Sequence, residues 1–322
     1  MSEREIEVGR VAKRVKFWFG TIRAPFFVAV ITPAILGTAI AWQSTGIFHW
    51  HYFLLVLLGA ALINSGTNLI NDYFDRATDD INVEYVAPFT GGSRVIQQGL
   101  IAPSRVLAVG ILCFAAAAVI GAYLVWDTWA SGPMILILGA IGVFSGFFYT
   151  APPLKLGYRW PAEAIVGLNC GILVTLGAYW IQVQAFSWQS LESWVPVIAS
   201  VPLGILIAAV LWVNEIPDYT ADKAAGKNHI VVLLGRERAA RGYLALLSAA
   251  YVWIAFMVIP EEIPLLALLG LLALPLALRA MRIAIKNYAD SKTLAPANAL
   301  TPMIYLATGL LMAVGFTIAG VV

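Results

Sequence analysis

Nine long runs of apolar residues constrain this chain more than any other feature. They cover roughly residues 25–43, 50–70, 105–126, 133–150, 162–183, 193–214, 240–258, 263–280 and 299–321. A helix needs about 20 such residues to cross the hydrocarbon core of a bilayer, and backbone groups in lipid must be satisfied within the segment. Only 12% of residues are charged and 61% are hydrophobic, so folding in water is not expected. The sequence predicts an all-α polytopic membrane protein with nine transmembrane helices.

The positive charges are segregated between alternate connections. All 20 Lys and Arg residues lie in segment 1–23, in the loops after the second, fourth, sixth and eighth runs, or at the edges of those loops. The other four loops, which carry no Lys or Arg, are 44–49, 127–132, 184–192 and 259–262. Basic loops tend to stay in the cytoplasm. We therefore expect a protein of the cell membrane with a cytoplasmic N-terminus and an external C-terminus.

Two matching polar series continue out of the second and sixth runs. Both have the form N-x3-D-x3-D, and they consist of Asn71, Asp75 and Asp79, and of Asn214, Asp218 and Asp222. Side chains four residues apart share one face of a helix, so each series predicts a stripe of oxygen atoms. Both follow even-numbered runs, which places both stripes on the same side of the membrane.

Paired stripes of this kind suit Mg²⁺ and a diphosphate. Magnesium prefers oxygen ligands and is usually held by carboxylates together with substrate phosphate. Two facing stripes predict more than one ion, most simply two, with a diphosphate bridging them. The metal would stabilise the charge that develops on a departing diphosphate. A solvated acidic helix end is the alternative, and it explains one such turn better than two in matching register.

Basic and amide side chains near the stripes are candidates for contact with the substrate. Positively charged groups bind phosphate oxygens, and the cytoplasmic loops offer Arg76, Arg94, Lys155, Lys223 and Lys227, with Asn68 one turn before the first series. For any one basic residue, retention of the loop in the cytoplasm is an equally good explanation.

The first series reads Asn-Asp-Tyr-Phe-Asp-Arg-Ala-Thr-Asp over residues 71–79, and with the second D-x3-D it resembles the Asp-rich motifs of the UbiA-type intramembrane prenyltransferases. The resemblance implies one transmembrane prenyltransferase domain over residues 1–322, with helices around a central cavity. It implies that loops 71–104 and 215–239 form helical cytoplasmic caps. It also implies that Asp72 supports the site and that Tyr149 and Lys155 take catalytic roles, although the family often spaces such a pair four apart and here it is six.

Two further segments resemble the menaquinone-pathway branch of that family. They are residues 88–99 and 214–235. The branch joins a polyprenyl chain to 1,4-dihydroxy-2-naphthoate with loss of carboxylate, so the resemblance implies Mg²⁺-dependent transfer from a polyprenyl diphosphate to an aromatic acceptor. Sister branches use 4-hydroxybenzoate, homogentisate, chlorophyllide, haem or a glycerol-phosphate lipid, and these acceptors remain open.

A membrane transporter is the alternative from another class. Transporters usually carry functional charges near the bilayer midplane, whereas the centres of the nine predicted spans lack Asp, Glu, Lys and Arg. A membrane phosphatase or a prenyl-diphosphate cyclase would share the diphosphate chemistry and would differ in its products.

Overall fold

The computed structural model describes residues 20–79, 92–128, 132–185 and 194–322, and these residues are mostly helical. Eight helices within them are long and apolar enough to cross a membrane. A further apolar helix, α6 (Gly132–Phe147), has 16 residues, which is short of the usual spanning length of about 20. The predicted all-α membrane architecture is confirmed, and the exact count of nine spans is not established.

The first half of the chain forms two long helix hairpins with short elements between them. Its elements are η1 (Ala24–Phe27), α2 (Val28–Thr45), α3 (Trp50–Phe74), α4 (Arg76–Asp79), α5 (Pro103–Asp127), α6 and η2 (Leu156–Tyr158). Each long helix matches one of the predicted apolar runs. The helix α3 extends beyond its apolar run into the first polar series.

The second half begins with one continuous helical run that changes its winding. It consists of α7 (Ala162–Gly167), the π-helical η3 (Leu168–Leu173) and α8 (Val174–Val183). The remaining elements are α9 (Val195–Ala224), α10 (Ile230–Leu234), α11 (Arg236–Phe256), η5 (Leu265–Ala273), α12 (Leu274–Asn287) and α13 (Ser291–Ala319). Both α9 and α13 are longer than their apolar runs, because polar residues with helical spacing continue them at one end.

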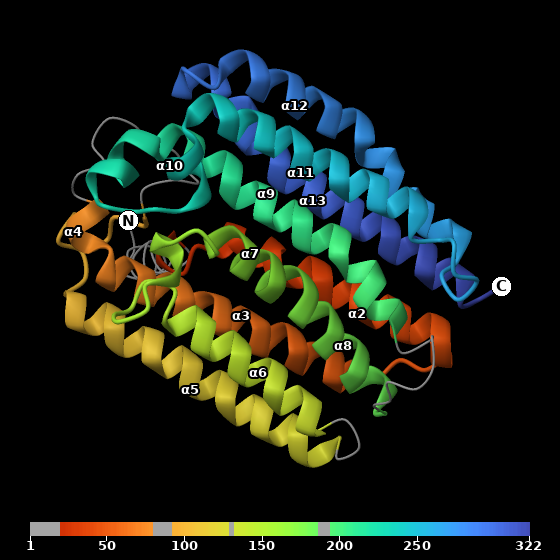
Figure 1. Cartoon of the computed structure of the whole chain (residues 1–322). Coiled ribbons are helices and arrows are strands. Elements are labelled where there is room, and N and C mark those ends of the chain that lie inside the picture. Colours follow the sequence, from red (N-terminus) through yellow and green to blue (C-terminus); the bar gives the residue numbers. More distant parts are fainter. Residues whose placement is uncertain (1–19, 80–91, 129–131, 186–193) are drawn as a thin grey trace, which may run out of the picture.

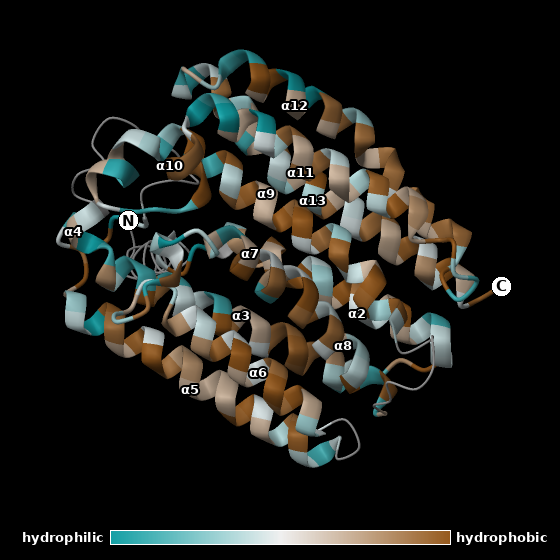
Figure 2. Ribbon diagram, in the orientation of Figure 1, coloured by the Kyte–Doolittle hydropathy of each residue, from teal (hydrophilic) through white to brown (hydrophobic). Residues whose placement is uncertain are grey.

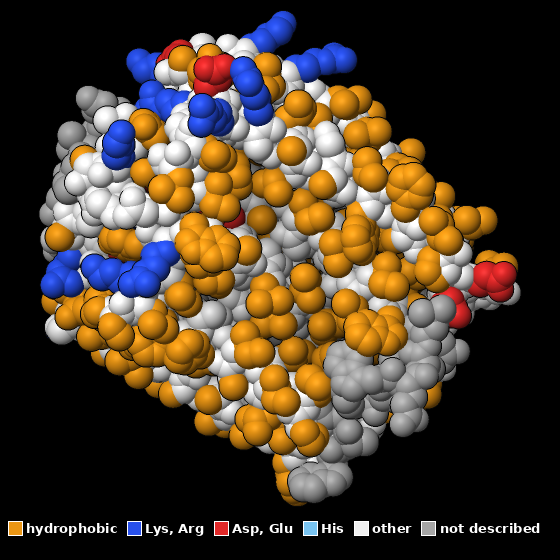
Figure 3. Space-filling view, viewed as in Figure 1, with side chains coloured by type: hydrophobic (Ala, Val, Ile, Leu, Met, Phe, Trp, Pro, Cys, Tyr) orange, Lys and Arg blue, Asp and Glu red, His pale blue; other side chains and the backbone are white. Residues whose placement is uncertain are grey.

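The long helices lie side by side, with α4 and α10 at one end of the bundle and the C-terminus at the other (Figure 1). Hydrophobic residues cover the middle of the helices, and hydrophilic residues collect towards their ends (Figure 2). Lys and Arg side chains gather at the end that carries α10, while hydrophobic side chains cover most of the visible flank (Figure 3). This is the surface expected of helices that face lipid.

The helix α9 lies at the centre of the packing, and 72% of its most apolar window is buried. Small residues let it touch the π-helical segment directly. A Cβ atom on Gly171 would lie 2.4 Å from the Cα of Gly204, so no larger side chain fits there without movement of the backbone. Close contact through small residues is a common way to hold membrane helices together, and it fixes the helix that carries the second polar series.

Candidate functional site

A cavity of about 680 Å³ lies inside the bundle, between the α3, α5 and α6 helices on one side and the α7–α8 run and α9 on the other. Members of both predicted stripes line it, namely Asn71, Asp75, Asn214, Asp218 and Asp222. The structure therefore brings the two series together around one space. The last member of the first series, Asp79, ends α4, and its side chain is outside the described part of the structure.

The first stripe is held by side chains from the segment that follows α6. The hydroxyl of Thr150 donates a hydrogen bond of 2.8 Å to the amide oxygen of Asn71. The hydroxyl of Tyr158 donates one of 2.9 Å to Asp75. Burial raises the pKa of Asp75, and the nearby Lys227 and the Tyr158 hydrogen bond partly oppose that effect. A nearby cation favours the ionised form of such a buried carboxyl group.

Asp72 faces a different set of partners from its neighbours in the motif. Its side chain forms an ion pair of 2.8 Å with Arg23 and accepts hydrogen bonds from the backbone N–H of Ser93 at 3.2 Å and from the Ser93 hydroxyl. Asp72 therefore fastens the segment before η1 and the segment after residue 91 to the end of α3. The supporting role in catalysis that the resemblance implies for Asp72 stays a prediction.

The second stripe contains a buried ion pair. Lys227 lies 2.8 Å from Asp222, and its side chain also lines the cavity. Burial alone would lower the pKa of Lys227, but the attraction of Asp222 and of Asp75 outweighs it and raises the pKa. One ammonium group therefore responds to carboxylates of both stripes. The same carboxylate has a second partner, because His229 Nε2 lies 3.1 Å from Asp222.

Tyr158 connects the two halves of the site. Besides its bond to Asp75, its backbone oxygen accepts a hydrogen bond of 2.7 Å from the N–H of Asn228, and the Lys227 ammonium lies 5.4 Å from its ring centre. Burial, followed by the charge of Asp75, raises its pKa to about 12. Sequence reasoning missed Tyr158, and its only signal was an aromatic residue between Lys155 and Arg159 in a basic loop.

The predicted basic residues separate into two groups. Lys227 lines the cavity. The other four, Arg76, Arg94, Lys155 and Lys223, are not among the described residues that line it. The exposed ammonium groups of Lys155 and Lys223 lie over the rings of Tyr158 and Tyr219, at 4.9 and 5.6 Å from the ring centres.

The other two predicted basic residues are Arg76, which begins α4, and Arg94, which lies in the segment before α5. Arg76 donates a hydrogen bond of 2.5 Å to the backbone oxygen of Tyr73. Arg94 has a left-handed backbone with φ of 60°. Arg23 lines the cavity, although its position in the basic N-terminal segment indicated only a topological role.

Two of the candidate asparagines, Asn68 and Asn214, form hydrogen bonds with other asparagine side chains. The side-chain N–H of Asn298 donates 2.8 Å to the Asn214 oxygen, and Asn68 donates 3.0 Å to Asn64. Both Asn68 and Asn214 line the cavity. An amide oxygen has two lone pairs, so Asn214 keeps one acceptor position for a cation.

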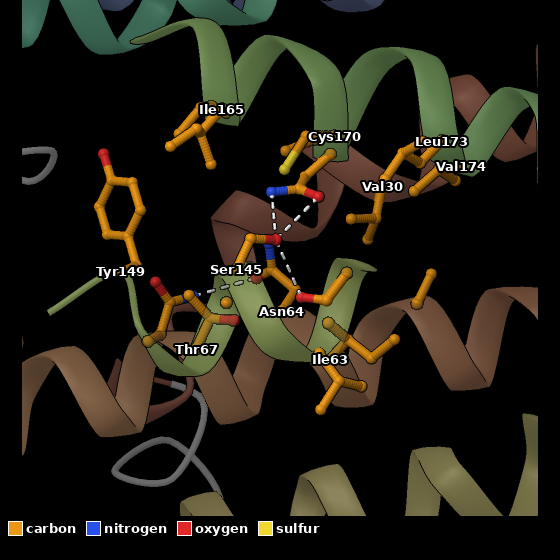
Figure 4. A pocket seen from close by; sticks show the side chains of 18 of the residues that line it. Val30, Ile63, Asn64, Thr67, Ser145, Tyr149, Ile165, Cys170, Leu173 and Val174 are labelled. Carbon is orange, nitrogen blue, oxygen red and sulfur yellow. Dashed lines mark hydrogen bonds between the residues drawn. The ribbon is translucent and has the colours of Figure 1, made fainter. Parts of the chain in front are cut away.

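The cavity changes character along its length. Figure 4 shows Tyr149 beside a polar group formed by Asn64, Thr67 and Ser145, and Ser145 accepts a hydrogen bond of 2.8 Å from the Asn169 amide. Apolar residues continue the wall, including Val30, Ile63, Leu173 and Val174. A ligand with a charged head and an apolar tail fits this order of surfaces. Lys155, the predicted companion of Tyr149, lies outside the lining.

Three further titratable residues are buried next to the second stripe, and sequence analysis gave none of them a role. Glu163, Glu215 and His229 come from α7, α9 and the residue before α10, and their exposed fractions are 3%, 8% and 1%. Glu215 directly follows Asn214 in the sequence, which was an available signal. Glu163 and His229 gave none, since only the fold brings them to α9.

Comparison with known proteins agrees with this architecture. The UbiA prenyltransferase family model matches residues 30–300. The chain is 29% identical over 308 residues to the 2-carboxy-1,4-naphthoquinone phytyltransferase of Synechocystis, covering 95% of this chain and 94% of that protein. It is 30% identical to the 1,4-dihydroxy-2-naphthoate octaprenyltransferase of Mycobacterium tuberculosis, covering 82% and 84%.

Solved structures share the fold. A UbiA homolog from Aeropyrum pernix has a TM-score of 0.69 at 16% identity, covering 90% of this chain and 98% of the other. A UbiA homolog from Archaeoglobus fulgidus bound to DMAPP and Mg²⁺ has a TM-score of 0.55 at 17% identity, covering 92% and 99%. With the family match over most of the sequence, we conclude that the chain belongs to the UbiA prenyltransferase family and is an integral membrane enzyme that transfers prenyl groups.

Proposed function

We propose that this enzyme transfers a polyprenyl group from its diphosphate to 1,4-dihydroxy-2-naphthoate. Relatives from Mycobacterium tuberculosis and Escherichia coli carry the name 1,4-dihydroxy-2-naphthoate octaprenyltransferase, the latter at 28% identity over 98% of this chain. The observation that carries the proposal is the meeting of both Asp-bearing stripes on one cavity whose wall continues into apolar residues.

The donor set of the cavity fits Mg²⁺. Amide and carboxylate oxygens from two helices converge, with Asn71 and Asp75 on α3 and Asn214, Asp218 and Asp222 on α9. Such oxygen ligands suit Mg²⁺, and we assign one ion to each stripe. Bound there, Mg²⁺ would neutralise the diphosphate and stabilise the charge on the leaving group.

The chain's own cations complete the binding of the diphosphate. Lys227 is paired with Asp222 and lines the cavity, so its ammonium would be in position to contact the phosphate oxygens of a bound diphosphate. Arg23 remains paired with Asp72 at the edge of the cavity and keeps a fixed positive charge near the same position. Tyr158 orients Asp75 through its hydrogen bond.

The reaction itself requires the cavity to hold an acceptor ring against the first prenyl carbon. The ring carbon that bears the carboxylate attacks this carbon, and the allylic C–O bond breaks with its electrons leaving on diphosphate. Loss of the carboxyl group as CO₂ then restores the aromatic ring, so no side-chain base is needed. The apolar wall excludes water from the developing allylic cation, and Tyr149 lies at the polar end of that wall.

A second candidate differs in the prenyl donor. The Synechocystis relative is named a phytyltransferase that acts on 2-carboxy-1,4-naphthoquinone, and its match covers 95% of this chain. A quinone ring is poor in electrons, so attack on an allylic cation favours the reduced, dihydroxy form. The two candidates therefore share the acceptor skeleton and differ in whether the cavity takes a phytyl chain or a longer one.

Mass spectrometry of the products tests both candidates. The purified enzyme is incubated with Mg²⁺, with phytyl or octaprenyl diphosphate, and with 1,4-dihydroxy-2-naphthoate, 4-hydroxybenzoate or homogentisate. We expect one dominant adduct that contains the naphthalene ring and lacks its carboxyl group. A preferred adduct with another acceptor would overturn the acceptor assignment, and release of free prenol without an adduct would overturn acceptor prenylation by this site.

We also propose that the end bearing α4 and α10 faces the cytoplasm in the cell membrane. The Lys and Arg side chains visible on the surface gather towards that end (Figure 3), and basic segments tend to remain cytoplasmic. Substrates would then reach the motifs from the inner leaflet.

A further inference from the structure

A second group of potential metal ligands lies beside the Asp-bearing stripes. Glu163 on α7, Glu215 on α9 and His229 before α10 each offer one ligand atom, and these atoms all lie within 4.8 Å of one another. All three residues are more than nine-tenths buried. Glu163 and Glu215 are 52 residues apart in the sequence, and Glu215 and His229 are 14 apart, so the fold brings three separate segments together here.

Each of the three side chains leaves one buried atom without a hydrogen-bond partner. These atoms are Glu163 Oε2, Glu215 Oε2 and His229 Nδ1. The imidazole nitrogen lies 3.4 Å from Glu215 Oε2 and 4.0 Å from Glu163 Oε1, without hydrogen-bond geometry to either. Buried polar atoms are nearly always satisfied, because an unpaired one is costly. The carboxyl groups of Glu163 and Glu215 are close enough to share a proton, but His229 Nδ1 keeps no partner. A cation held by all three side chains would satisfy these atoms together.

The remaining polar atoms of His229 and Glu163 already have partners. His229 Nε2 lies 3.1 Å from a carboxylate oxygen of Asp222, and the backbone N–H of Ile230 donates 3.0 Å to Glu163 Oε1. Histidines that bind metals usually donate their second ring N–H to a carboxylate, which orients the ring and its free nitrogen. The Asp222–His229 contact has this form and aims Nδ1 at the two glutamates.

The donor set specifies the class of ion. One imidazole and two carboxylates suit Zn²⁺ or another divalent transition metal better than Mg²⁺, which prefers oxygen ligands alone. Ligand atoms about 2.0–2.1 Å from a tetrahedral ion lie roughly 3.4 Å apart. The His229–Glu215 separation of 3.4 Å matches, whereas His229 lies 4.0 Å from Glu163, so the Glu163 side chain would move closer when the ion binds. Since Glu215 and His229 line the cavity, a fourth coordination position would open towards it.

We propose that Glu163, Glu215 and His229 form a binding site for one divalent transition-metal ion, separate from the two Asp-bearing stripes. The site is joined to the second stripe through Asp222, so an ion in it would fix the orientation of that carboxylate. The proposal does not depend on the identity of the acceptor.

Direct binding of Zn²⁺ tests the proposal without any assay of activity. The full chain is purified in detergent, stripped with a chelator, dialysed against Zn²⁺ in excess Mg²⁺, and measured for bound metal by mass spectrometry. The same measurement on Asp75→Asn combined with Asp218→Asn removes two carboxylates of the stripes. We expect one Zn²⁺ per chain in both proteins, with Co²⁺ giving a spectrum of nitrogen and oxygen ligation.

Two substitutions within the cluster and two matched controls locate the ion. Glu163→Gln and His229→Ala should each weaken Zn²⁺ binding at least tenfold. The exposed carboxylate variant Glu237→Gln and the histidine variant His51→Ala should bind as the unmodified chain does. Glu163→Gln keeps the size of the side chain, so it retains the test if His229→Ala does not fold, as judged by its elution and melting profile.

Three results would overturn the site. These are a folded, unmodified chain that keeps no Zn²⁺ in excess Mg²⁺, equal Zn²⁺ binding by the folded Glu163→Gln variant, and a Co²⁺ spectrum with oxygen ligands alone. The first result would mean that Glu163, Glu215 and His229 are held together by shared protons and not by a metal ion. The prenyl-transfer assay is run separately, so its failure and the failure of this site are distinguishable.

Discussion

The Tyr158 hydroxyl donates a hydrogen bond of 2.9 Å to Asp75, although 83 residues separate the two in sequence. This bond orients one carboxylate of the first stripe, and the same tyrosine contacts Lys227 and Asn228 in the segment that follows the second stripe. We expect Tyr158→Phe to raise the Mg²⁺ concentration for half-maximal activity about tenfold, in line with other outer contacts of metal ligands. Titration of activity with Mg²⁺ measures this.

The matched control for that substitution is Tyr123→Phe, which removes a similar bond of 3.1 Å to Asp127 away from the cavity. An unchanged Mg²⁺ requirement in Tyr158→Phe, with the control behaving alike, would show that the bond does not orient a metal ligand.

Removing a carboxylate from either stripe should nearly abolish prenyl transfer. We expect Asp75→Ala and Asp218→Ala each to lower kcat/KM by at least about 100-fold, because a lost ligand removes several kcal/mol of stabilisation of the leaving group. Excess EDTA should do the same to the unmodified enzyme. Glu261→Ala, an exposed carboxylate in the loop after α11, is the control. Full activity of either aspartate variant, or in the chelator, would exclude the metal–diphosphate assignment.

Two lysines four residues apart should differ in their effect on the diphosphate substrate. Lys227 lines the cavity beside Asp222, whereas Lys223 is exposed and lies 3.4 Å from the Tyr219 hydroxyl. We expect Lys227→Met to raise the KM for polyprenyl diphosphate about tenfold or more, since it removes a charge-assisted contact, and Lys223→Met to change it less than threefold. Steady-state kinetics with varied diphosphate measure both. The opposite ranking would mean that the segment at the end of α9 rearranges on binding.

Close packing at Gly171 should make its substitution costly. An added Cβ would meet backbone atoms of Gly204 at 2.4 Å, whereas at Gly177, on the same helical run, the nearest atom would lie 3.9 Å away. We expect Gly171→Ala to destabilise the fold by about 1–3 kcal/mol, the usual cost of overpacking, and Gly177→Ala to have little effect. Melting temperatures of the two variants in the same detergent make the comparison. Equal values would mean that α9 and η3 can separate.

The first turn of α13 should respond to acid through Asp290. This residue accepts a hydrogen bond from the Lys292 backbone N–H, and that bond, followed by the Thr293 hydroxyl, lowers its pKa. Because the folded pKa lies below the unfolded one, the stabilisation is present at neutral pH and is lost as pH falls through the folded value. We expect Asp290→Ala to lower the melting temperature by about 2 °C at pH 7. The difference should shrink below pH 4, and a constant difference would exclude the charge effect.

Local patterns in the sequence predicted the parts of this structure that depend on neighbouring residues. Apolar length located the long helices, and spacing of four placed Asn71, Asp75, Asp218 and Asp222 on two stripes that do meet. Composition could not show that α6 is short, because 16 helical residues and a following loop read as one apolar run.

The partners of those stripes could not be predicted, because the contacts are long-range. Tyr158 reaches Asp75 only when the loop after α6 folds over α3. Glu163 and His229 join Glu215 only through the packing of α7 against α9. From the sequence, Lys155, Lys223 and Lys227 were equally good candidates for contact with the diphosphate. In the folded chain Lys227 lines the cavity, whereas Lys155 and Lys223 lie over tyrosine rings outside it.

The length of α9 has a consequence for where the second stripe lies in the membrane. Its 30 residues extend about 45 Å at 1.5 Å per residue, well beyond a hydrocarbon core of about 30 Å. Asp218 and Asp222 lie in the last two turns of this helix, so they are expected where α9 leaves the hydrocarbon core. At that depth an amphiphilic diphosphate could meet these carboxylates with its apolar tail still in the hydrocarbon.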